Sequence, residues 1–192
     1  MARPSVREAR KQQILDAFEV CVARYGVEGT TLERMAAEAG LARALIRHHM
    51  GNRDDLLRAL VKRFTERSDA EMSQLWDQLP AQDGLETLVT WLFDPDYLDL
   101  QQIQVAQALI AVAGERPEVA DAMGSWTADF IGQLERVIAD QRSEARPEAI
   151  NAVAVGIAGI YFNWESLAHL GESDRLRSAS MEAAKRLLDS LD

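Results

Sequence analysis

Apolar residues recur at intervals of three and four along most of the chain, which is the spacing of amphipathic helices. The first such segment covers residues 6–25 and stops at Gly26, a residue type that commonly ends helices. The same pattern predicts eight further helices. They cover residues 30–39, 42–50, 53–79, 84–93, 97–113, 117–145, 147–170 and 173–191. We therefore expect an all-α protein of about nine helices without a convincing strand.

The boundary residues between positions 30 and 57 sharpen this picture. Thr30 followed by Glu33 is the pattern of a capping box, Gly40 supplies a tight turn, and Asn52 is a helix N-cap. A short helix, a glycine turn and an arginine-bearing second helix make a helix-turn-helix, which places one helix in the major groove of DNA. We expect a helix-turn-helix DNA-binding domain over residues 1–52 and a helical regulatory and dimerisation domain over residues 53–192.

The charge distribution agrees with a DNA-binding N-terminal part, although the net charge of the chain is −10. Residues 1–67 carry 13 Lys and Arg against 9 Asp and Glu, whereas residues 68–192 carry 8 against 22. Contacts to phosphates depend on local cationic side chains and not on the global sum. A basic N-terminal part on an acidic remainder orients the protein on a polyanion.

Other functional classes find little support. The three histidines and the single cysteine, Cys21, make no metal cluster at ligand spacing, and no nucleophile arrangement or phosphate loop is visible. The N-terminus lacks the apolar stretch of a secretory signal, and no run has the length of a membrane span. We expect a cytoplasmic protein that is not an enzyme and uses no metal, no cofactor and no membrane.

The N-terminal segment resembles the TetR family of transcriptional regulators. The matching residues are Ile14, Ala17, Gly26, Thr30, Thr31, Met35, Ala36, Ala39, Gly40, Leu41, His49, Arg53, Leu56 and Leu57. The chain departs from the family at Ala42, usually a small hydroxyl residue, at Arg47, usually tyrosine, and at Met50, usually phenylalanine. Because arginine can serve the same phosphate as the tyrosine, we expect DNA binding with an altered sequence preference.

The helix after Gly40 carries the predicted recognition surface. Arg43 and Arg47 are four residues apart and share a helix face, and a guanidinium fork fits guanine or two phosphate oxygens. The alternative is a solvated face with a salt bridge to Glu33 or Glu38. The candidate DNA contacts are Thr30, Thr31, Arg43, Ala44, Arg47, His48 and Arg53. We expect His49 to face inward, and the basic residues Arg3, Arg7, Arg10 and Lys11 either to reach DNA or to form a free basic end.

Two copies of such a helix bind a palindromic duplex operator better than one, so we expect a homodimer. Small residues on the penultimate helix and an apolar stripe on the last helix suit a four-helix bundle with a partner. The candidate interface residues are Gly156, Gly159, Leu176, Ala183 and Leu187. The alternative is that these two helices bury their faces within one chain.

The region after residue 90 concentrates aromatic and amide side chains, which together line the usual small-molecule site. The candidate effector contacts are Trp91, Tyr97, Gln104, Met123, Trp126, Phe130, Tyr161 and Trp164. Each of them could instead belong to the core. The resemblance implies a repressor that a small-molecule effector releases from its operator. The alternative is a dimeric helical protein-interaction module with a degenerate DNA-binding head.

Overall fold

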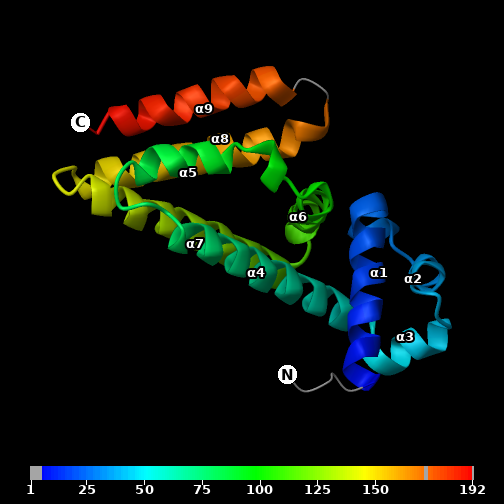
Figure 1. Cartoon of the computed structure of the whole chain (residues 1–192). Helices are drawn as coiled ribbons and strands as arrows, with labels where there is room; N and C mark the ends of the chain where they lie inside the picture. The colour runs from blue at the N-terminus through cyan, green and yellow to red at the C-terminus, as the bar shows by residue number, and fades with distance from the viewer. Residues whose placement is uncertain (1–5, 171–172, 192) are drawn as a thin grey trace. The chain divides into compact units, whose positions relative to one another are not determined.

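A computed structural model describes residues 6–170 and 173–191, which are helical almost throughout and include no strand (Figure 1). The helices are α1 (Val6–Gly29), α2 (Leu32–Ala39), α3 (Arg43–Met50), α4 (Arg53–Asp77), α5 (Gly84–Leu92), α6 (Leu100–Ala113), α7 (Pro117–Gln141), α8 (Pro147–Leu167) and α9 (Ser173–Asp189). Two short 3-10 helices cover Pro95–Tyr97 and Ala168–Leu170. The predicted all-α class is confirmed for the described residues.

The chain forms two compact units. The head unit runs to Ser68 and also takes in Gln101–Met123, whereas the body unit comprises Asp69–Leu100 and the chain from Gly124 onward. Helices α4 and α7 each contribute residues to both units. The head unit is therefore larger than the predicted DNA-binding segment 1–52, and the boundary at residue 52 stays a prediction.

The head unit has its own apolar core, to which α1, α2, α3 and α4 each contribute. Its buried side chains include Ile14, Phe18, Val22, Met35, Ile46, Leu57, Leu60 and Phe64. Full burial of such a side chain stabilises a fold by about 1.5–3 kcal/mol. The buried carboxylate of Glu19 pairs with Arg67 of α4 at 3.0 Å and with Arg63 at 3.4 Å. These contacts hold α1 against α4.

The chain turns sharply at Gly26, where φ is +70° and ψ is 171°. The hydroxyl of Thr30 donates to the Gly26 carbonyl at 2.7 Å, and Thr30 is buried. The N-cap of α2 is Thr31, whose hydroxyl accepts from the backbone N–H of Arg34 at 3.2 Å. The predicted capping box of Thr30 and Glu33 is therefore wrong by one residue, because the turn at Gly26 directs Thr30 back toward α1.

Both turns around α3 follow the sequence signals. Gly40 adopts the left-handed conformation, with φ of +63°, and ends α2. Ala42 is the N-cap of α3 and has no side chain to accept a hydrogen bond. At the start of α4, the Asn52 side chain accepts from the Asp55 backbone N–H, and the Asp55 carboxylate accepts from the Asn52 N–H, both at 2.9 Å. The predicted cap at Asn52 is confirmed.

In the body unit, α8 packs along α9 and α9 also contacts α5 (Figure 1). Their shared core includes Leu88, Val89, Phe93, Leu134, Ile138, Ala154, Ile157, Trp164, Ala184 and Leu188. The Gln141 side chain accepts from the Leu85 N–H at 3.2 Å, and a side chain at Gly84 would overlap the Gln141 amide. Among the described helices, none combines the length and apolarity needed to cross a bilayer.

Candidate nucleic-acid interface and effector site

Helix α3 presents a polar face to solvent and one apolar residue to the core. Arg43, Ala44, Arg47 and His48 are exposed, whereas Ile46 is completely buried. The predicted orientation of this helix is therefore confirmed as far as exposure is concerned. An exposed helix with two guanidinium groups one turn apart can reach base edges or phosphates in a groove.

The Arg43 guanidinium already has a partner on α2. Its Nη1 atom lies 2.5 Å from the Glu33 carboxylate, and both side chains are more than half exposed. An exposed ion pair of this kind contributes no more than about 1 kcal/mol. DNA phosphates or bases can therefore compete with Glu33 for Arg43.

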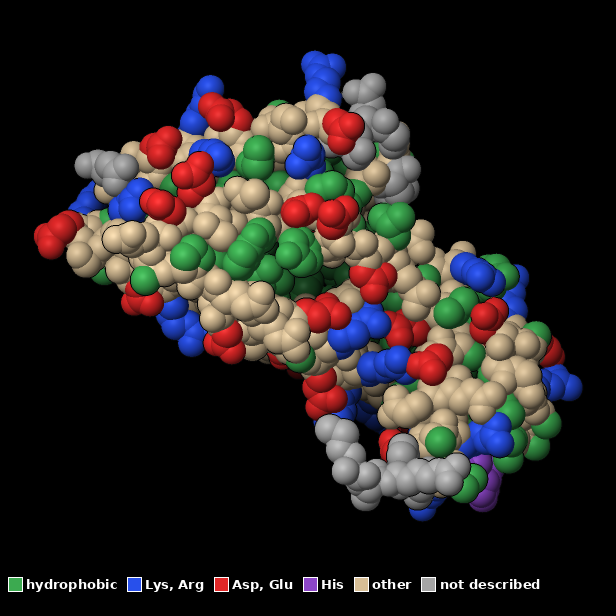
Figure 2. Space-filling model, in the orientation of Figure 1, with side chains coloured by type: hydrophobic (Ala, Val, Ile, Leu, Met, Phe, Trp, Pro, Cys, Tyr) green, Lys and Arg blue, Asp and Glu red, His purple; other side chains and the backbone are tan. Residues whose placement is uncertain are grey.

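Histidine side chains reach the surface of the head unit beside the end of α3 (Figure 2). The rings of His48 and His49 meet edge to face with centroids 5.1 Å apart. Desolvation lowers the pKa of His49, and the charges of His48 and of Arg10, Arg7 and Lys11 on α1 lower it further. The basic start of α1 therefore faces the end of α3. Arg3 lies outside the described residues.

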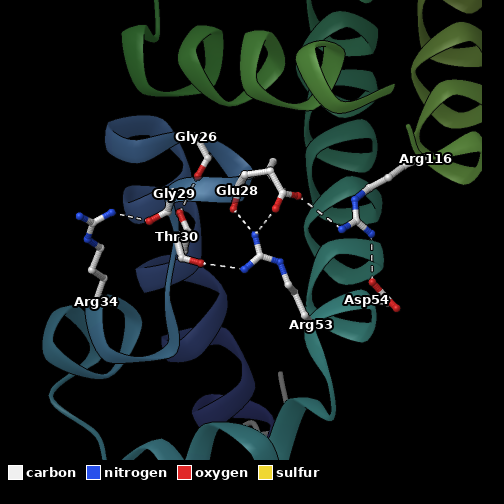
Figure 3. Close-up of polar contacts among 9 residues, drawn as sticks. Gly26, Glu28, Gly29, Thr30, Arg34, Arg53, Asp54 and Arg116 are labelled. Atoms are coloured by element: carbon white, nitrogen blue, oxygen red, sulfur yellow. Dashed lines mark hydrogen bonds and ion pairs between the residues drawn. The ribbon is translucent and has the colours of Figure 1, made fainter. Parts of the chain in front are cut away.

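Arg53, predicted to meet a phosphate, contacts the end of α1 (Figure 3). Its guanidinium donates to the Val27 carbonyl at 2.7 Å and to the Thr30 carbonyl at 3.2 Å, and pairs with Glu28 at 3.2 Å. These contacts fix the start of α4 against the loop before α2. The side chain is still 44% exposed, so one side of it remains open to a ligand.

Arg116, which precedes α7, extends this set of contacts and was missed by sequence reasoning (Figure 3). It pairs with Asp54 at 3.0 Å and with Glu28 at 3.4 Å. The hydrogen bond to Asp54, with that to Glu28 and both carboxylate charges, raises the Arg116 pKa against a smaller desolvation effect. Arg116 is 62 positions from Asp54 and 88 positions from Glu28 in the sequence. No local sequence pattern indicates contacts over such separations.

A hollow of about 630 Å³ lies among α2, α3 and the start of α4. Its lining includes the polar residues Thr31, Arg47, Asn52 and Arg53, and the apolar residues Phe18, Leu32, Met35 and Leu56. Two guanidinium groups, a hydroxyl and an amide can together hold phosphate oxygens. The hollow therefore presents hydrogen-bond donors of the kind that bind oxyanions.

The body unit holds a connected cluster of aromatic rings. The Tyr161 ring stacks on Phe130 with centroids 5.6 Å apart, and Phe93 lies 5.4 Å from Trp164 and 6.1 Å from Tyr161. Phe162 joins Trp126 to the cluster at 5.4 Å. We call these six residues, together with Trp76, which lies 6.4 Å from Phe130, the aromatic cluster. Sequence reasoning missed Trp76, since it falls on the long helix α4.

A carboxylate belongs to this cluster. The Tyr161 hydroxyl donates to Glu165 Oε1 at 2.5 Å, one turn further along α8. Burial raises the pKa of Glu165 to about 7, against an opposing effect of the Tyr161 hydrogen bond. Burial also raises the Tyr161 pKa well above its usual value, and the charges of Glu165 and Glu71 and the hydrogen bond to Glu165 add to this. Near neutral pH the carboxyl group is therefore close to half protonated.

The structure brings only part of the predicted effector residues together. Trp126, Phe130, Tyr161 and Trp164 belong to the aromatic cluster, whereas Trp91 is half-buried and Tyr97 is exposed in the same unit. Two others belong to the head unit, where Gln104 is exposed on α6 and Met123 is buried on α7. Among the described residues, no group of three or more side chains suits a metal ion.

The predicted dimer residues divide into two kinds. A side chain at Gly156 would come within 2.8 Å of Leu187 Cδ1 of the same chain, so this glycine serves packing between α8 and α9. Gly159 is exposed with open space around it, and Leu176 and Ala183 are half-buried on α9. The small residue at 156 is thus explained within one chain, whereas position 159 remains open to a partner.

The head unit resembles a known protein family. Residues 14–60 match the family of bacterial regulatory proteins called the tetR family. The match includes most of α1, all of α2 and α3, and the start of α4. It therefore contains the exposed helix α3 and the helices around it. Helices α2 and α3 with the turn at Gly40 are thus a helix-turn-helix of the kind found in bacterial regulatory proteins. Over residues 14–60, the chain carries the N-terminal domain of the TetR family of bacterial regulatory proteins.

The curated relatives match about half of the chain. A helix-turn-helix transcriptional repressor of Mycobacterium tuberculosis is 35% identical over 102 residues, which cover 46% of this chain and 54% of the repressor. The transcriptional repressor AcnR of Corynebacterium glutamicum is 29% identical over 96 residues, covering 50% and 47%. The chain spans about half the length of the curated relatives it matches.

Solved structures extend the likeness to the whole fold. A TetR transcription regulator from Haloarcula marismortui has a TM-score of 0.78 at 16% identity and covers 95% of this chain and 98% of its own. A transcriptional regulator from Saccharomonospora viridis, solved in complex with choline, has a TM-score of 0.76 at 18% identity and covers 95% and 96%. At these identities the likeness concerns the fold.

Proposed function

We propose that this protein is a sequence-specific DNA-binding transcription regulator. The observation that carries the proposal is the exposed face of α3, on which Arg43 and Arg47 stand one turn apart while Ile46 anchors the helix in the core. A bidentate contact from arginine to a base discriminates by about 1–3 kcal/mol. Arg43, Ala44, Arg47 and His48 are the residues we assign to base and phosphate contacts.

Phosphate contacts position the recognition helix on the duplex. The hollow beside α3 offers Thr31, Arg47, Asn52 and the open side of Arg53 to one phosphate. Thr30 acts indirectly: its hydroxyl donates to the Gly26 carbonyl, and its own carbonyl accepts from Arg53 and so helps to position that side chain. Such contacts fix register and supply most of the salt-dependent affinity.

The regulator acts as a homodimer on a two-fold symmetric operator. An exposed strip of small and apolar residues runs along α8 at Ala152, Val155 and Gly159. Small residues allow a second helix to approach closely, and half-buried Leu176 and Ala183 of α9 offer further apolar area. Two α8–α9 pairs then form a four-helix bundle.

A small-molecule effector in the body unit releases the protein from its operator, so that it acts as a repressor in the cytoplasm. The aromatic cluster with its carboxylate supports a ligand site in this unit. A coupling free energy of about 1–3 kcal/mol between effector and DNA would change DNA affinity by roughly 5–150-fold.

In vitro selection from a random duplex pool tests the proposal. We expect enrichment of a two-fold symmetric motif, bound by a dimer with an affinity that falls steeply as salt rises. Absence of any enriched motif, together with no binding to random duplex at 50 mM salt, would contradict it. That outcome would favour a helical protein-interaction module.

A further inference from the structure

The pairing of Tyr161 and Glu165 places a carboxylate where its negative charge is poorly compensated. In the described part of the chain, Glu165 has the neutral Tyr161 hydroxyl as its hydrogen-bond partner and no cationic side chain paired with it. On α4, Glu71 adds a second negative charge that acts on Tyr161. A half-buried anion without a cation is costly unless a counter-charge is supplied.

The rings around this pair offer the second element of a cation site. Phe130 stacks on Tyr161 at 5.6 Å, and Phe93 and Trp164 lie 6.1 Å and 6.4 Å from it. The faces of aromatic rings carry negative partial charge and attract cations, most strongly where water is excluded. The ring faces and the carboxylate therefore both attract a cation.

The donor set also selects the kind of cation. Hard ions such as calcium and magnesium need six or more oxygen ligands, and zinc needs a group of His, Cys and carboxylate side chains. The described residues contain no such group, and one carboxylate with aromatic rings suits a weakly hydrated organic cation. In addition, the buried indole N–H of Trp164 has no partner within the described chain and could donate to an acceptor on the same ligand.

We propose that the effector of this regulator is a small organic cation, of the quaternary or tertiary ammonium class, held by the Glu165 carboxylate and the rings of Tyr161, Phe130 and Trp164. This inference rests on the proposed ligand-responsive function and specifies its ligand class. The Tyr161 hydroxyl orients the carboxylate, which contacts the cation. In molecules whose Glu165 is protonated, cation binding converts the carboxylic acid to the carboxylate and releases its proton to solvent.

Calorimetric titration with matched probes tests this. The probes are phenyltrimethylammonium and its neutral isostere tert-butylbenzene, with benzyltrimethylammonium and tetraethylammonium to vary size. We expect the wild-type protein to prefer phenyltrimethylammonium by at least about tenfold over the isostere. Because burial raises the pKa of Glu165 to about 7, the cation affinity should rise about tenfold from pH 6 to pH 8. The isostere should show no such change.

Two variants on the same helix make the test specific. Glu165→Gln should bind the isostere as the wild type does and lose the preference for the cation, whereas exposed Glu148→Gln should keep it. Failure of all three cations to bind, or a preference that survives Glu165→Gln, would overturn the inference. A protein that binds selected DNA but none of the cations overturns this inference alone, whereas failure to bind DNA overturns the proposed function.

Discussion

The guanidinium of Arg116 lies 3.0 Å from the carboxylate of Asp54, so the segment before α7 is joined to the first turn of α4. The same guanidinium approaches Glu28 at the end of α1, and Glu28 in turn pairs with Arg53 (Figure 3). Four side chains from three parts of the sequence thus meet where the end of α1 approaches the start of α4. The start of α4 is positioned by these contacts as well as by its cap.

Replacing Arg116 with alanine should weaken the head unit slightly. The partners Asp54 and Glu28 are exposed, so we expect the free energy of unfolding to fall by no more than about 1 kcal/mol in low salt. The difference should disappear in 1 M NaCl, because salt screens exposed pairs. Urea unfolding at both salt concentrations measures this, with exposed Arg136→Ala as the control. A loss that persists in high salt would contradict an electrostatic role.

Replacing Glu33 with glutamine should increase DNA affinity. The change removes the partner that holds Arg43 and one negative charge beside the phosphates. Since the exposed pair contributes at most about 1 kcal/mol, we expect an affinity increase of up to about fivefold. Anisotropy titration of a labelled duplex measures it, and Glu118→Gln, an exposed change on α7, is the control. Weaker binding of Glu33→Gln would show that Glu33 positions Arg43 for DNA.

The same substitution at two glycines of α8 should separate packing from dimerisation. Gly156→Leu forces a side chain against Leu187, and such overpacking costs about 1–3 kcal/mol of stability. Gly159→Leu meets open space within one chain and should leave subunit folding intact while weakening the dimer. Sedimentation and thermal unfolding of both variants measure this. A Gly159→Leu protein that remains fully dimeric at micromolar concentration would place the interface elsewhere.

The stability contributed by Glu165 should fall as pH rises. Its folded-state pKa of about 7 exceeds the reference value of 4.5, so the folded protein holds a proton that the unfolded chain has lost between these values. Glu165→Gln should therefore equal the wild type near pH 5 and exceed its unfolding free energy by roughly 2 kcal/mol at pH 8. Urea unfolding at both pH values decides this, with Glu148→Gln as the reference. An equal difference at both pH values would place the cause in packing.

Periodicity and turn residues predicted the helices well, because both signals are local. The turn at Gly40 and the cap at Asn52 depend on residues within four positions of each other. The cap of α2 was predicted at the wrong threonine. The Thr30 hydroxyl donates to the Gly26 carbonyl, so Thr31 accepts from the Arg34 N–H and caps the helix. The capping-box spacing favours Thr30, because Glu33 follows it by three residues while Arg34 follows Thr31, so the pattern misses a turn that depends on α1.

Contacts between residues far apart in the sequence could not be predicted from local patterns. Arg53 was predicted as a phosphate contact, and its position in the helix was right, but its bonds to Val27 and Thr30 depend on how α1 meets α4. The role of Gly156 likewise depends on Leu187, which lies on the next helix. Single-sequence patterns predict which face a residue occupies and not which distant residue it meets.

The salt dependence of DNA affinity in arginine variants of α3 decides whether this helix contacts DNA. On a duplex carrying the selected operator, Arg47→Ala should reduce the slope of log affinity against log salt by about 0.9 per lost phosphate contact. Arg43→Ala should lose about 1–3 kcal/mol of discrimination at one base pair of each half-site, whereas Arg136→Ala should match the wild type. If both α3 variants bound the operator with wild-type affinity, salt slope and specificity, α3 would not be the recognition helix and the account would be wrong.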